Sequence, residues 1–203
     1  MSNITLAFDT CLDKMYVTLA EGKDIKDSRV VENHDEKYHS AFLISTIRDV
    51  LKKNNLRPED INLIATNIGP GSFTGIRACT TVARVMAQQL NCKAIGVSSL
   101  EILSKIEPDI DAVALDARKN KAYLYFDKEI KGAVELEAAE KICKGKKVIT
   151  DNKLEDLFGG KSYQKTEAPL GEILARLASE KISENECDWR KLKPLYIQPP
   201  PMG

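Results

Sequence analysis

A glycine-rich segment at residues 68–77, with the sequence IGPGSFTGIR, is the part of the chain best suited to bind an anion. It joins an apolar run to a helical pattern, and the N-terminus of a helix offers free N–H groups and a partial positive charge to a phosphate. Glycines allow a ligand to approach the backbone closely, while hydroxyl and guanidinium groups add hydrogen-bond donors. The residues of this segment expected to contact phosphate are Gly69, Gly71, Ser72, Gly75 and Arg77.

This segment differs from the two best-known phosphate-binding patterns. It lacks the lysine of GxxxxGK[ST], and Gly75 comes one residue too late for GxGxxG. Two interpretations therefore stay open: a phosphate-binding loop, or a tight turn that brings a helix close to a sheet.

A second candidate for chemistry is the pair Asp9 and Thr10, which ends the first apolar run. A carboxylate at a β-turn can hold Mg²⁺ or orient water, and the following backbone can meet a phosphate. The alternative is an aspartate that only caps the turn, which is common.

The histidines and cysteines do not indicate a metal site. His34 and His39 are five residues apart, whereas two histidines on one helix bind a metal at a spacing of four. The cysteines are odd in number and contain no CxxC pair, which indicates reduced thiols and a cytoplasmic protein. They are Cys11, Cys79, Cys92, Cys143 and Cys187. We therefore expect no metal, and exposed or capping histidines.

Strands and helices alternate along the chain, which predicts an α/β fold. The first part predicts strands at 4–8, 15–20, 27–31, 62–67 and 93–97 and helices at 40–53, 75–90 and 98–105. After Pro108 the pattern restarts, with strands at 112–118, 122–126 and 147–150 and helices at 138–143, 154–158 and 170–182. Both parts open with an apolar strand that ends in an aspartate, Asp9 or Asp116, which indicates a duplication. The sequence thus predicts two domains, 1–108 and a smaller 109–203 with a basic, proline-rich tail.

The helix predicted at 75–90 is apolar over more than half of its circumference, more than one sheet face requires. It is either enclosed within one domain or covered by a second chain. The periodicity places seven residues near such a partner, the last three as second candidates: Ala78, Cys79, Val82, Met86, Leu43, Ile47 and Val50.

Composition excludes nucleic-acid binding by bulk charge. The 203 residues contain 30 basic and 30 acidic side chains, so that the formal net charge is zero. Any RNA contact must be local or come through a partner; the basic segments 144–147 and 190–193 suit a solvated surface first and an RNA patch second. No apolar run reaches the roughly 18–20 residues of a membrane span, and residues 1–9 lack the pattern of a secretory signal.

Three strings, LAFDTCLDKMYVTLAEG, IGPGSFTGIRACTTVA and ALDARKNKAYLYF, occur in this order and resemble the TsaB (YeaZ) family. The resemblance implies the fold of actin, Hsp70 and the sugar kinases: two related mixed-sheet domains. It also implies a role in making threonylcarbamoyladenosine on tRNA, in which TsaC makes threonylcarbamoyl-adenylate. TsaD then transfers the threonylcarbamoyl group to N6 of the adenosine beside the anticodon in tRNAs that read codons beginning with A.

For this chain, the resemblance implies a non-catalytic subunit that supports TsaD, together with the ATPase TsaE. Pairing through helices of the first domain is expected, as a heterodimer with TsaD or as a homodimer. The chain itself is expected to require no cofactor, and tRNA to be met through the complex.

Two other functions stay open. A small kinase-like enzyme of the same fold would use Asp9 for magnesium and residues 69–75 for the phosphates of ATP or ADP; the short second half departs from the nucleotide-closing domain of such kinases. A metallopeptidase is less well supported. TsaD-type subunits bind metal through HxxxH, which the spacing of His34 and His39 does not match.

Overall fold

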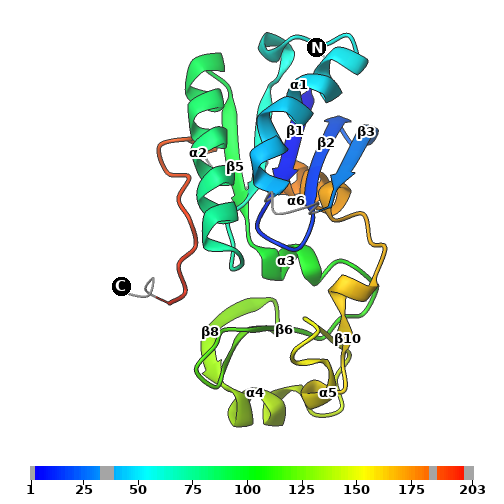
Figure 1. Cartoon of the computed structure of the whole chain (residues 1–203), viewed down its shortest axis with the longest axis vertical. Coiled ribbons are helices and arrows are strands. Elements are labelled where there is room, and N and C mark those ends of the chain that lie inside the picture. The colour runs from blue at the N-terminus through cyan, green and yellow to red at the C-terminus, as the bar shows by residue number, and fades with distance from the viewer. Residues whose placement is uncertain (1–2, 33–38, 183–186, 199–203) are drawn as a thin grey trace. The chain divides into compact units, whose positions relative to one another are not determined.

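A computed structural model describes residues 3–32, 39–182 and 187–198 (Figure 1). The chain forms two compact units, one of residues 1–99 and 170–195 and the other of residues 100–169 and 196–203. Within the described residues, the helices are too short or too polar to cross a membrane.

The first unit is built on a five-stranded mixed sheet with the order β3-β2-β1-β4-β5. Strands β1 to β3 form an antiparallel meander, and β4 and β5 continue the sheet parallel to β1. The strands are β1 (Ile4–Asp9), β2 (Met15–Glu21), β3 (Asp24–Val31), β4 (Leu63–Asn67) and β5 (Lys93–Val97). Because β1 and β4 are parallel neighbours, their C-terminal residues Asp9 and Asn67 end at the same edge.

Helices cover both faces of this sheet (Figure 1). Helices α1 (Leu43–Lys53) and α2 (Phe73–Leu90) pack on one face, and α6 (Leu170–Lys181) packs on the other. Side chains alternate between the two faces of β1, so Leu6 and Phe8 both point to the face covered by α1 and α2. There they form one apolar cluster with Ile47, Val50 and Cys79.

Helix α6 makes the first unit discontinuous in sequence. The division predicted from the sequence was a single cut after residue 108, which would place α6 with the second half. In the structure α6 returns to the first sheet, where it lies against β1 and β2. Gly171 permits this approach, because a Cβ there would lie 2.4 Å from Thr18 Oγ1.

The second unit repeats the strand order of the first. Its sheet has the order β10-β9-β6-β7-β8, with β6 to β8 antiparallel and β9 and β10 parallel to β6. The strands are β6 (Ala112–Asp116), β7 (Lys121–Phe126), β8 (Glu129–Glu135), β9 (Val148–Thr150) and β10 (Lys161–Ser162). Helices α4 (Leu136–Cys143) and α5 (Glu155–Phe158) cover one face, and α3 (Ser99–Leu103) leads in from the first unit. The predicted α/β duplication is confirmed.

Short 3-10 turns complete the described elements, at His39–Phe42, Pro58–Asp60 and Tyr163–Lys165. Helix α2 begins two residues before the predicted start, because Ser72 caps it: its Oγ accepts a hydrogen bond from Gly75 N at 3.3 Å. Asn91 ends α2 in a left-handed conformation with φ of 49°.

An ion pair with a buried carboxylate connects β3 of the meander to the end of α1. The side chain of Asp27 in β3 is 7% exposed and accepts hydrogen bonds from Lys53 Nζ at 2.9 Å and Asn54 Nδ2 at 3.1 Å. Burial alone would raise the pKa of Asp27, but these two donors outweigh burial and lower it.

We predict that Asp27→Asn lowers the free energy of unfolding by about 1–2 kcal/mol at pH 7. Because the pKa of Asp27 is lowered in the folded state, its contribution is complete above the unfolded pKa of about 3.9 and is lost as the pH falls through the folded pKa. The gap to the native chain, measured by urea unfolding, should narrow steadily as the pH falls below the unfolded pKa of about 3.9. Asp24→Asn, at an exposed position of the same strand, is the matched control. A gap that is independent of pH would contradict this account.

Candidate functional site

The two carboxylate oxygens of Asp9 are both hydrogen-bonded inside the protein. Oδ1 accepts from Cys11 N at 2.6 Å, which closes the turn after β1. Oδ2 accepts from Asn67 Nδ2 at 2.9 Å, across the pair of parallel strands. Asp9 is 1% exposed. Through its hydrogen bond with Asn67, the buried carboxylate connects the ends of β1 and β4.

Asn67 is the residue at this site that the sequence reasoning missed. Besides binding Asp9, its Oδ1 accepts hydrogen bonds from Gly69 N at 2.8 Å and Ser99 Oγ at 2.9 Å. It is completely buried, and it fixes the start of the glycine-rich loop. A signal was present in the sequence: Asn67 is a polar residue that ends a buried strand parallel to the strand of Asp9.

The glycine-rich loop lies directly on the turn that follows Asp9. Ser72 N donates to Cys11 O at 2.8 Å, and Thr10 Oγ1 donates to Gly75 O at 2.8 Å. A Cβ on Gly71 would lie 2.3 Å from Cys11 O, and one on Gly75 would lie 1.8 Å from Thr10 O. Both glycines are therefore needed for a backbone-to-backbone approach, which we call the hairpin–loop contact (Thr10–Cys11 against Gly71–Gly75).

Cys79 of α2 extends this contact with its thiol. Thr10 N donates to Cys79 Sγ at 3.1 Å, and Thr10 Oγ1 lies 3.1 Å from the same sulfur. Thr10 Oγ1 also donates to Gly75 O, and the Cys79 thiol has Phe8 O as a further acceptor at 4.0 Å. Thr10 thus holds α2 against the end of β1.

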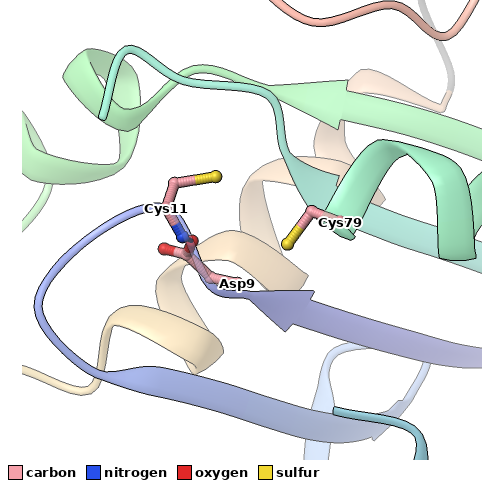
Figure 2. Close-up of side chains that lie close together, drawn as sticks. All are labelled: Asp9, Cys11 and Cys79. Carbon is pink, nitrogen blue, oxygen red and sulfur yellow. Dashed lines mark hydrogen bonds between the residues drawn. The ribbon is translucent and has the colours of Figure 1, made fainter. Parts of the chain in front are cut away.

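Asp9, Cys11 and Cys79 converge in a small buried cluster (Figure 2). Their ligand-type atoms lie within 4.8 Å of one another, and all three residues are buried. A cysteine binds a metal as its thiolate, but burial, followed by the hydrogen bond with Cys79, raises the pKa of Cys11 well above its usual value. The carboxylate and both thiols already have partners within the chain. The cluster does not fit a metal site and serves packing.

The structure divides the predicted phosphate contacts into a buried and an exposed group. Asp9, Thr10, Gly69 and Gly75 are buried, whereas Gly71, Ser72 and Arg77 are exposed. The guanidinium of Arg77 lies over the ring of Phe73, 5.3 Å from its centroid. The carboxylate of Asp9 is thus engaged inside the protein, the guanidinium of Arg77 lies on the surface, and the chain's own turn occupies the space beside Gly71 and Gly75. These residues do not fit a nucleotide phosphate with its magnesium.

The predicted partner contacts need a correction. Four of them lie in the apolar core of their own unit and are at most 4% exposed: Leu43, Ile47, Val50 and Cys79. The other three, Ala78, Val82 and Met86, are half-buried. Helical periodicity identifies an apolar stripe, but it does not tell which part of a wide stripe faces the chain's own sheet. His34 lies outside the described residues, and His39 opens the short turn before α1.

The outward surface of α1 and α2 nevertheless carries large apolar side chains. Phe42 and Ile44 are 38% and 59% exposed at the start of α1, and Phe73 and Val85 are 45% and 53% exposed on α2. Beside Val85 lies a shallow hollow of about 280 Å³, lined by Thr81, Arg84, Val85, Gln88 and Trp189. On α2 the exposed large apolar side chains are Phe73 and Val85, neither of which was among the predicted partner contacts.

Two units with one strand order, each with an aspartate at the end of its first strand, form the duplicated mixed-sheet α/β fold that the sequence predicted. A family model described as TsaD, tRNA N6-adenosine threonylcarbamoyltransferase, matches residues 30–181. The chain belongs to this family.

The relatives agree with the resemblance found in the motifs. The chain is 32% identical over 105 residues to the tRNA threonylcarbamoyladenosine biosynthesis protein TsaB of Buchnera aphidicola subsp. Schizaphis graminum, covering 52% of this chain and 49% of that one. It is 32% identical over 91 residues to TsaB of Bacillus subtilis, covering 43% and 40%. The chain thus spans about half the length of the curated relatives it matches, or less.

Among solved structures, YeaZ from Pseudomonas aeruginosa has the same fold, with a TM-score of 0.70 and 21% identity over 96% of this chain and 99% of that one. The prediction of the TsaB (YeaZ) family is confirmed.

We predict that Gly75→Ala lowers the free energy of unfolding by more than about 3 kcal/mol, because the new Cβ would collide with Thr10 O and separate the two backbones. Chemical denaturation would measure the loss. Thr81→Ala, at an exposed position of the same helix, should change stability by less than about 0.5 kcal/mol. If the two variants were equally stable, the hairpin–loop contact would not be the constraint described here.

Proposed function

We propose that this chain is a non-catalytic subunit of the machinery that transfers a threonylcarbamoyl group to N6 of an adenosine in tRNA. It acts by binding and supporting a TsaD-type transferase. The family and the TsaB relatives support the pathway. The observation that supports the subunit role is the hairpin–loop contact, in which backbone atoms of Thr10 and Cys11 lie against Gly71 and Gly75 of the loop that the sequence had suggested for phosphate.

The surface of α1 and α2 supports a partner-binding role. Phe42, Ile44, Phe73 and Val85 expose apolar area to solvent, and Val85 borders the hollow with Trp189. Interface cores are enriched in aromatic residues and depleted of charge, and a central hollow can receive an anchoring side chain. We therefore place the heterodimer contact with TsaD here, and the same surface would pair two copies when TsaD is absent.

The remaining parts of the proposal follow from this role. TsaE joins the heterodimer, tRNA is modified within the complex, and the location is the cytoplasm. We propose that this chain needs no cofactor of its own; ATP serves TsaE and the enzyme TsaC that makes threonylcarbamoyl-adenylate.

The kinase-like alternative would need Asp9 to reach magnesium and Gly69–Gly75 to receive phosphates. Both carboxylate oxygens of Asp9 are engaged, and the residue is buried. A metallopeptidase would need a coordinating cluster with thiolates or histidines free to bind. Among the described residues the one candidate cluster is Asp9, Cys11 and Cys79, which is hydrogen-bonded internally. Neither alternative gains support.

The test is reconstitution of threonylcarbamoyladenosine on unmodified tRNA with TsaC, TsaD and TsaE, with and without this chain. We predict that product requires the chain, and that Val85→Glu, at a 53% exposed position, lowers product formation and TsaD binding at least about tenfold while the chain stays folded.

Val30→Glu is the matched control, because Val30 is 52% exposed on the edge strand β3, away from α2. It should leave both readouts unchanged. Product that does not depend on the chain, with no binding to TsaD, would refute the subunit role. Intact binding by Val85→Glu would refute only the placement of the surface.

A further inference from the structure

The turn between β6 and β7 is the second copy of the Asp9 turn, and it differs from the first in its surroundings. Asp116 Oδ1 accepts a hydrogen bond from Arg118 N at 2.8 Å, as Asp9 Oδ1 does from Cys11 N. In the first copy the glycine-rich loop covers the turn. In the second copy Arg118, Lys119 and Asn120 are exposed.

The charges at this turn are not balanced. Lys153 Nζ binds Asp116 Oδ2 at 2.7 Å, and Lys121 Nζ binds Glu135 at 3.0 Å, so these two lysines are neutralised. Within the described part of the chain, neither Arg118 nor Lys119 forms an ion pair within 4.0 Å. Two adjacent cations are therefore presented to solvent by a rigid two-stranded hairpin.

The three residues of this turn have the left-handed backbone conformation that glycine adopts more easily than other residues. Arg118, Lys119 and Asn120 have φ angles of 59°, 48° and 60°, all in the left-handed region. Such conformations are unfavourable for residues with a Cβ, and they concentrate at functional sites. The chain keeps two long cationic side chains at positions where glycine would be less strained.

An aromatic side chain lies next to the cations. Ala122 and Leu124 of β7 pack into the core under α4, so that strand alternation directs Tyr123 to the opposite face with Lys121. Burial raises the pKa of the Tyr123 hydroxyl, and the nearby charge of Arg118 partly offsets this effect. A basic tip beside a half-exposed tyrosine suits RNA, which combines phosphates with bases that can stack.

The other basic segment of this unit is less suitable. Lys147 pairs with Glu107, and Lys161 pairs with the same carboxylate. Lys146 lies over the ring of Phe126 in the same unit. Two of the three lysines of segment 144–147, Lys146 and Lys147, thus have contacts within the protein, unlike Arg118 and Lys119.

We propose that the β6–β7 turn (Arg118–Asn120) binds the phosphate backbone of tRNA. This inference rests on the proposed function for the identity of the RNA, and it goes beyond that function by giving this chain a direct contact with the substrate. The chain has no net charge, so the contact is local, through about two phosphates, and each phosphate neutralised on a duplex contributes about −0.9 to the slope of log K against log salt.

The experiment is titration of the purified full chain into fluorescently labelled, unmodified tRNA at about 50 mM and about 150 mM salt. Lys119→Glu should weaken binding at least about fivefold at the lower salt and make the salt slope shallower by about one. Lys128→Glu is the matched control: Lys128 is also exposed and left-handed, with φ of 59°, but it lies in the turn at the other end of β7. The control should bind like the native chain.

Three results would overturn the proposal: no binding by the native chain at the lower salt, equal weakening by both substitutions, or equally tight, Lys119-dependent binding of poly-glutamate. The last result would assign the turn to an acidic protein instead. Circular dichroism checks that both variants are folded. If the native chain binds tRNA through Lys119 but gives no product with TsaC, TsaD and TsaE, the proposed function fails and the RNA contact stands.

Discussion

The packing of the Asp9 turn against the glycine-rich loop is the constraint on which the first unit depends. Three separate segments meet there: the end of β1, the end of β4 and the start of α2, joined by Asn67 and Thr10. A helix N-terminus usually presents unpaired N–H groups that suit an anion. Here Cys11 O accepts from Ser72 N and Ser72 Oγ accepts from Gly75 N, so the chain itself satisfies two of the N–H groups at this place.

The two units show how one architecture takes different roles when its surroundings change. Both have the same strand order, and both use an aspartate to close the turn after the first strand. In the first unit the turn is buried and supports a helix that exposes the large apolar side chains Phe73 and Val85 among polar ones. In the second unit the turn is exposed and basic. The first arrangement suits a protein partner, and the second suits a polyanion.

The sequence predicted the helices and strands better than the contacts between them. Strong apolar runs identified β1, β4 and β6, and the repeated aspartate predicted the duplication. β8 (Glu129–Glu135) was missed, because the apolar residues of EIKGAVE do not alternate with polar ones. In the structure none of its residues is buried. Periodicity in α6 did not indicate which sheet it covers, and the wide apolar stripe of α2 did not separate Cys79 in the core from Val85 at the surface. Asn67 was missed because its role depends on a neighbouring strand that is distant in sequence.

The central claim is our proposal that the hairpin–loop contact leaves no room for a nucleotide phosphate beside Gly71 and Gly75. The most direct measurement is the melting temperature of the full chain with increasing Mg-ATP, to about 5 mM, because any ligand of the folded state raises it by mass action. We predict no change beyond that caused by an equal ionic strength of salt. A saturable rise that persists in Lys119→Glu, and therefore does not come from the β6–β7 turn, would contradict the account, because the contact between Gly75 and Thr10 leaves no room for a phosphate there.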